Sequence, residues 1–92
     1  MAITWVSAKV AEGTSTTMPT HAVGDLLVIV AMRFASATIP SLPSGWTSVA
    51  TNGTTYGCRI GWRVATSAAM ASGTWTNAED LNIAVYRGAA VG

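Results

Sequence analysis

Few side chains in this sequence are of the types that perform covalent chemistry. The chain has one histidine, His21, and one cysteine, Cys58, which with Asp25 would supply the residue types of a nucleophilic triad. We disfavour that interpretation, because Cys58 falls on the apolar side of a predicted strand, where a thiol behaves as a small buried hydrophobic group. A small hydrolase is therefore the least favoured hypothesis, and we expect no catalytic residue and a protein that is not an enzyme.

Metal and cofactor sites have equally little support in the sequence. A metal centre needs three or four converging His, Cys or carboxylate ligands, and this chain has one His and one Cys far apart. Glu79 and Asp80 are adjacent, so in a strand they point to opposite faces and cannot act as the paired carboxylates of a glycosidase. The glycines match neither common phosphate-loop motif. We expect neither a metal nor a cofactor.

Tryptophans and arginines offer a different chemistry, which is recognition by flat ring and guanidinium surfaces. Four tryptophans are many for 92 residues, and exposed ones could stack on sugar rings. Aromatic residues are also enriched in protein interfaces, and we favour this second role. The interface or ligand candidates are Trp5, Trp46, Arg59, Arg63 and Trp75.

Composition points to a protein that covers apolar surface with partners. Half of the residues are hydrophobic and only 10% are charged, where about 25% is usual for a soluble domain. The longest apolar run, from Leu26 to Met32, is far shorter than the ~20 residues of a membrane-spanning helix. No basic segment precedes an apolar run at the N-terminus, so we expect neither membrane insertion nor a signal peptide.

The charge and the cysteine content further limit the classes of partner that we expect. Five basic and four acidic residues leave a formal net charge of +1, and the basic residues are scattered rather than clustered as in nucleic-acid-binding proteins. A single cysteine excludes a disulfide within the chain. We therefore expect association with protein, and not with nucleic acid or membrane.

The residue types that surround these candidates predict an all-β fold in one domain, 1–92. Short runs rich in Val, Ile, Trp and Tyr are separated by Thr, Ser and Gly. They predict strands at about 2–10, 25–35, 46–51, 54–65 and 80–87, with a short piece at 74–76. The connections Glu12 to Gly24, Ser36 to Gly45 and Thr66 to Gly73 are expected to be loops.

Asn52-Gly53 predicts a two-residue type I′ turn, because that turn needs positive φ at both central positions. The resulting hairpin register sets Val49 opposite Tyr56 and places Trp46 beside Arg59. It also assigns the two faces of the strand 54–65. The apolar set, expected in the core, is Tyr56, Cys58, Ile60, Trp62 and Val64, and the opposite set is Gly57, Arg59, Gly61 and Arg63.

Two other strands bear on assembly. The run from Leu26 to Met32 is apolar on both alternating faces, which is typical of a central strand covered on both sides by a second sheet or another subunit. The N-terminal strand alternates Ile3 and Trp5 with Thr4 and Val6, so neither of its faces is clearly polar. An edge strand of this kind invites a partner.

The order of several segments resembles the β-sandwich domains of bacteriophage and prophage virion proteins, of the tail-fibre-like or capsid-associated kind. The segments are Gly24-Asp25-Leu26-Leu27-Val28, Pro43-Ser44-Gly45-Trp46-Thr47, Arg59 to Val64, Ser72-Gly73-Thr74-Trp75-Thr76 and Val85-Tyr86-Arg87-Gly88. The resemblance implies an antiparallel, jelly-roll-like β-sandwich and a structural role in a particle. Such domains commonly continue with further strands, so we expect a partner chain or a longer product to complete the sandwich.

These observations lead to one principal hypothesis and one alternative of a different class. The principal hypothesis is a non-enzymatic structural protein of a phage-type virion, either a capsid decoration or a tail-appendage component. It would be assembled in the host cytoplasm and would act as a homo-oligomer or with other virion proteins. The alternative is a carbohydrate-binding or receptor-binding module that presents Trp46 and Trp75 to a glycan or host receptor.

Overall fold

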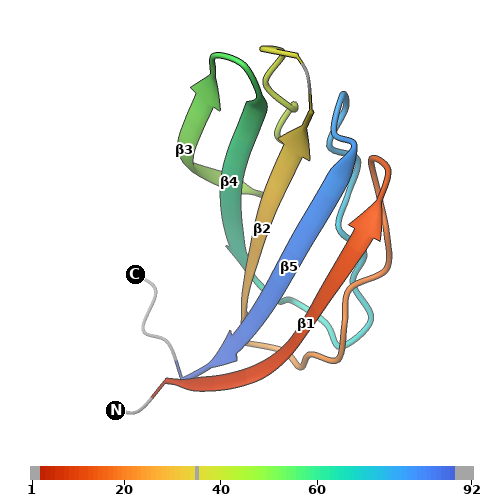
Figure 1. Ribbon diagram of the computed structural model, residues 1–92. Helices are drawn as coiled ribbons and strands as arrows, with labels where there is room; N and C mark the ends of the chain where they lie inside the picture. Colours follow the sequence, from red (N-terminus) through yellow and green to blue (C-terminus); the bar gives the residue numbers. More distant parts are fainter. Residues whose placement is uncertain (1–2, 35, 89–92) are drawn as a thin grey trace.

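The computed structural model describes residues 3–34 and 36–88, and within them the fold is all-β, with five strands in one antiparallel sheet and no helix. The order of the strands across the sheet is β1-β5-β2-β4-β3 (Figure 1). Their bounds are Thr4–Glu12 (β1), Leu26–Arg33 (β2), Thr47–Gly53 (β3), Gly57–Val64 (β4) and Asp80–Arg87 (β5).

All five main strand predictions are confirmed, with bounds that differ by a few residues. The short piece expected at 74–76 is irregular. Residues 2 and 35, which the predictions placed at strand ends, lie outside the described residues. One sheet is present in the described part of the chain, so the expected sandwich architecture is not confirmed by it.

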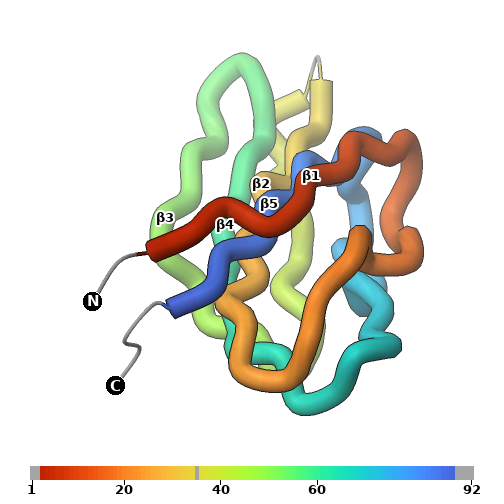
Figure 2. The backbone as a smooth tube through the Cα atoms, turned by 90° about the horizontal axis from the view of Figure 1, so that it is seen from below, coloured from red at the N-terminus to blue at the C-terminus, as the bar shows by residue number. Residues whose placement is uncertain are grey.

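The three long connections gather on one side of the sheet and take the place of a second sheet (Figure 2). Two of them are joined by backbone hydrogen bonds, since the Gly24 N–H donates to the Ala65 carbonyl at 2.8 Å and the Ser72 N–H to the Thr16 carbonyl at 2.9 Å. The third is tied in by the Ser41 N–H, which donates to the Thr76 carbonyl at 2.9 Å. The predicted loops therefore form a packed layer.

The hydrophobic core lies between the sheet and this loop layer. We call the side of the sheet that faces the loops the covered face. Its buried apolar residues are Leu27, Ile29, Ala31, Leu81, Ile83 and Val85. The loops contribute Trp46 and Trp75, whose rings pack edge to face with centroids 5.3 Å apart, and the indole N–H of Trp75 donates to the Ser72 carbonyl at 2.9 Å.

The predicted type I′ turn is wrong. Asn52 and Gly53 belong to β3, Gly53 pairs with Gly57, and neither Asn52 nor Gly53 has a positive φ. A Cβ on Gly53 would lie 2.8 Å from the Ala37 carbonyl oxygen. The glycine therefore admits the neighbouring loop and does not make the turn, and the predicted pairs of Val49 with Tyr56 and Trp46 with Arg59 do not form.

The predicted core face of β4 is also wrong. Gly57 and Gly61 are buried, whereas Cys58, Ile60 and Trp62 are only half-buried and Val64 and Tyr56 are exposed. A Cβ on Gly61 would lie 2.7 Å from the Trp75 ring, and one on Gly57 would overlap the Thr38 carbonyl. The loop layer packs directly on these two glycines, so the face without large side chains is the covered one.

Strand β2 is covered on one side by the described residues, and no second sheet covers its other side there; cover by another subunit stays a prediction. Leu27, Ile29 and Ala31 are fully buried, while the alternating residues Leu26, Val28, Val30 and Met32 remain partly accessible.

Candidate functional site

The side of the sheet away from the loops is the most unusual surface of the molecule, and we call it the open face. Pairing across the strands fixes its members, because residues that pair share a face. Its apolar side chains are Trp5, Ala8 and Val10 (β1), Leu26, Val28, Val30 and Met32 (β2), Ala50 (β3), Cys58, Ile60, Trp62 and Val64 (β4), and Ala84 and Tyr86 (β5).

A shallow hollow of about 350 Å³ lies on this face where β1, β5 and β2 meet. Small side chains form it, since Ala8 and Ala84 pair with each other between the larger Val10, Val28 and Tyr86. Val10 is 68% exposed and Ala8 is also exposed, whereas Val28, Val30, Ala84 and Tyr86 are half-buried. Contiguous apolar surface of this kind is uncommon on monomers and marks sites of interaction.

Basic side chains are excluded from the open face. All five lysine and arginine residues of the sequence lie in strands, and each points to the covered side. Lys9 Nζ donates to Thr17 Oγ1 at 2.9 Å, and Arg59 Nε donates to the Pro40 carbonyl at 2.7 Å. Arg33 Nη1 donates to the Asn77 carbonyl at 3.1 Å. These cations attach the loops to the sheet.

The charges of the open face are two carboxylates at one end. Glu12 pairs with Asp80, and Asp80 pairs with Met32, which places both carboxylates beside the last open-face residue of β2. The centre of the face holds one polar side chain, Asn82, between Val10 and Val30. The face therefore offers apolar contact over most of its extent, with one amide at its middle.

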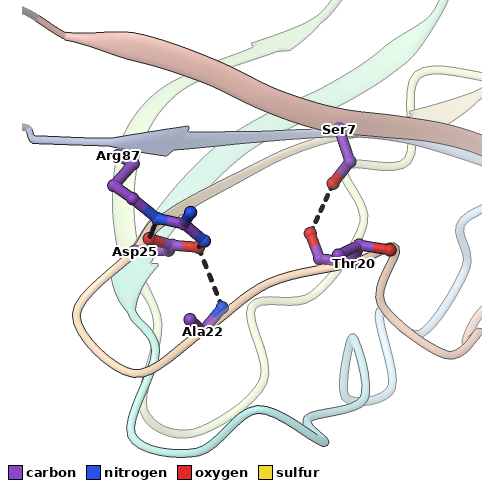
Figure 3. A network of polar contacts seen from close by, with 5 residues as sticks. All are labelled: Ser7, Thr20, Ala22, Asp25 and Arg87. Atoms are coloured by element: carbon purple, nitrogen blue, oxygen red, sulfur yellow. Dashed lines mark hydrogen bonds and ion pairs between the residues drawn. The ribbon is translucent and has the colours of Figure 1, made fainter.

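The densest polar network lies at the other end, on the covered side (Figure 3). Arg87 binds Asp25 through two parallel bonds, Nε to Oδ1 and Nη2 to Oδ2, each 2.8 Å long. The Ala22 N–H also donates to Asp25 Oδ2, at 2.9 Å. The paired guanidinium holds the pKa of the Asp25 carboxyl below its usual value despite the burial of that carboxyl, and the carboxylate raises the pKa of Arg87.

This network fastens the loop that precedes β2 to the end of β5. Nearby, Ser7 Oγ donates to the Thr20 carbonyl at 2.6 Å, which ties the same loop to β1 (Figure 3). The Asp25 carbonyl in turn accepts from the Ala65 N–H at 2.8 Å. Asp25 is thus a structural residue that joins the loop 13–25 to β5 and to the segment after β4.

His21 links two loops of the same layer. It is buried, its Nε2 accepts from the Met70 N–H at 3.1 Å, and its Nδ1 lies 2.7 Å from the Pro19 carbonyl oxygen. With Nε2 as acceptor, Nδ1 carries the proton and donates to Pro19. Both ring nitrogens are therefore used to hold two loops together.

The structure separates the residue types of a nucleophilic triad. Cys58 pairs with Met32 at one end of β2, whereas Asp25 directly precedes Leu26 at the other end, which is a separation of about 23 Å along the strand. No group of three or more His, Cys, Asp or Glu residues in 3–34 and 36–88 is arranged to bind a metal. The same part of the chain has no helix long and apolar enough to cross a membrane.

The five candidates identified from the sequence fall into three environments. Trp5 is 62% exposed and lies by register on the open face, at its margin. Trp46 and Trp75 are 7% and 0% exposed, so neither ring is presented at the surface as the glycan-binding alternative expects. Arg59 and Arg63 lie on the covered side, where the Arg63 guanidinium sits 6.0 Å from the Trp46 ring centre. The predicted contact of Trp46 with Arg59 is thus made by Arg63.

Sequence reasoning missed most of the open face. It assigned Ile60, Trp62 and Cys58 to the core and did not single out Val10 or Asn82 as candidates. The part that it did identify is the second apolar face of the segment from Leu26 to Met32, for which it expected a second sheet or another subunit as cover.

Comparison of the chain with protein-family models, with curated proteins and with solved structures gave no match.

Proposed function

We propose that this protein is a non-enzymatic structural subunit that packs its open face against a second β-sheet in a larger assembly. The observation that carries the proposal is the contrast between the faces: one side of the sheet is closed by loops and holds every basic side chain, and the other is mainly apolar and is left uncovered by the described residues. Packing a second sheet about 10 Å away would bury the open face and produce a β-sandwich.

A phage-type virion is the setting that we propose for this assembly, as a capsid decoration or a tail-appendage component. The support is the ordered series of segments that resembles virion β-sandwich domains, together with a surface suited to permanent burial. In such a particle the subunit acts by occupying fixed positions, and no bond is made or broken.

A particle-incorporation experiment tests this function. Val28 lies at the centre of the open face, and Val28→Glu places a carboxylate there without entering the core. We expect the variant to fold but to be lost from particles purified by density-gradient centrifugation from cultures that express the chain at its own locus.

Val23→Glu is the matched control, because Val23 is 68% exposed on a loop outside the open face. This variant should enter particles at the wild-type level. Equal incorporation of Val28→Glu and wild type, or absence of the wild-type chain from any particle fraction, would refute the proposal.

The glycan-binding alternative has weaker support. Stacking on a sugar requires an accessible ring face, and Trp46 and Trp75 use theirs in the core. Trp5 and Trp62, which retain accessible surface, belong to the open face and fit the packing role.

A further inference from the structure

We infer that the sheet packed on the open face is that of a second copy of this chain, related by a two-fold axis that crosses the strands near Asn82. The inference rests on the proposed function, since it names the partner of the same surface. Three observations carry it: the size of the face, the position of its charges and the position of its single central amide.

The size of the face matches what a second copy needs. Five strands of seven to nine residues form the sheet. With strands about 4.8 Å apart and a rise of about 3.3 Å per residue, each copy offers roughly 600 Å². Two copies would bury about 1,200 Å², which reaches the lower end of stable, specific interfaces. A second identical sheet also has the outline required to cover the first.

The positions of the carboxylates on the open face favour one direction for the two-fold axis. Glu12 and Asp80 both lie at one end of the open face. An axis parallel to the strands would superpose these ends and bring four carboxylates together, with no basic residue on the face to offset the repulsion. An axis across the strands sends the two pairs to opposite ends of the interface.

Asn82 supports the same axis. It pairs with Val30 in β2 and Val10 in β1, close to the middle of the face along the strands. An axis across the strands sets β5 over β5 of the second copy and brings the two Asn82 side chains together. A carboxamide both donates and accepts, so two of them satisfy each other across a two-fold axis. An axis along the strands would instead set Asn82 over β4, near the apolar Ile60.

The experiment compares two isosteric changes of amide to carboxylate by light scattering and analytical ultracentrifugation of the purified chain. Wild type should behave as a dimer of the 9.4-kDa chain. Asn82→Asp should raise the dimer Kd on the order of a hundredfold or more, because it sets two carboxylates against each other at the centre of the interface. Asn77→Asp, at an exposed loop position, should leave the Kd unchanged.

A cross-linking measurement tests the axis independently. A single thiol at the axis, from Asn82→Cys with Cys58→Ser, should join two chains through a short bifunctional thiol reagent that spans roughly 5 Å, because the sheets lie about 10 Å apart and each cysteine side chain takes up part of that distance. Cys58 in the unmodified chain lies beside Met32 at the acidic end and should not join to its own equivalent. Efficient linkage through Cys58 and none through position 82 would overturn the assignment.

The outcomes separate this inference from the proposed function. A wild-type chain that is monomeric at high concentration overturns the second-copy inference. If Val28→Glu is nevertheless lost from particles, the structural function stands and the partner is a different chain. A dimer that Asn82→Asp does not weaken refutes the two-fold contact at Asn82.

Discussion

Leu26 and Leu27 are adjacent in β2, yet Leu26 lies on the open face and Leu27 is fully buried in the core. The same contrast runs along β2, whose aliphatic side chains alternate between the two sides of the sheet. The faces differ in what approaches them: the loop layer packs on Gly57 and Gly61 on one side, and nothing in residues 3–34 and 36–88 packs in the same way on the other. In this fold, therefore, backbone accessibility decides which face the chain closes by itself, and hydrophobicity alone does not.

The largest difference in stability between the two faces should appear when Leu27 and Leu26 are each replaced by alanine. Leu27→Ala should lower the free energy of unfolding by about 2–5 kcal/mol, because it leaves a cavity under the loop layer. Leu26→Ala should lower it by less than about 1 kcal/mol, because its side chain retains contact with water. Urea unfolding in the Asn82→Asp background measures both without a contribution from association.

Equal losses for the two leucine variants would contradict the distinction between a covered and an open face. A change in the urea m-value for only one of them would indicate altered compactness, and that variant would then be compared by circular dichroism before its free energy is interpreted.

A smaller effect should come from enlarging the glycine face of β4. Gly61→Ala should cost about 1–3 kcal/mol by overpacking, because its Cβ would meet the Trp75 ring at 2.7 Å and Leu42 Cδ1 at 3.0 Å. Cys58→Ala changes a residue on the opposite face of the same strand and should cost less than about 0.5 kcal/mol. Thermal unfolding followed by near-ultraviolet circular dichroism reports the comparison, and a stable Gly61→Ala variant with an unchanged Trp75 signal would argue against tight loop packing.

The smallest expected effect on stability appears only at acidic pH and concerns the ion pair of Asp25 with Arg87, which attaches the loop layer to the sheet. Because the folded-state pKa of Asp25 is lowered, its ion pair contributes stability above the unfolded value of about 4 and loses it as pH falls from there through the folded value. Asp25→Asn should be less stable than wild type at pH 7 and should lose less stability between pH 7 and pH 3. Urea unfolding at each pH measures both slopes, and the same slope for Asp25→Asn and wild type would contradict the role of the ion pair.

The sequence predicted the elements of this fold better than their orientation. Strand positions follow from local composition, which is why all five were located and why the long connections were recognised as loops. The covered face of β4 was assigned wrongly because alternation reports that two faces differ, not which one the loops approach. Gly57 and Gly61 have no side chain to signal burial, and the segments that bury them, around Thr38 and Trp75, are distant in sequence.

The environments of the candidate site residues were not predicted for a similar reason. Trp46 and Trp75 were identified as candidates by residue type, but their burial depends on a loop layer that no local pattern encodes. The turn expected at Asn52-Gly53 failed for a related reason, because contact of Gly53 with the 36–45 segment outweighs the local preference of the pair. Val10 and Asn82 carry no recognisable motif, and only the register of β1 and β5 brings them to the centre of a surface.

Strand β3 has a consequence for how the molecule moves. All seven of its residues are exposed, and among the described strands it pairs with β4 alone, at the margin of the sheet. Local opening there sacrifices little buried surface, so its amides should exchange with solvent far sooner than those of β2 and β5. The centre of the sheet should therefore stay fixed while its β3 margin adjusts to whatever lies beside it.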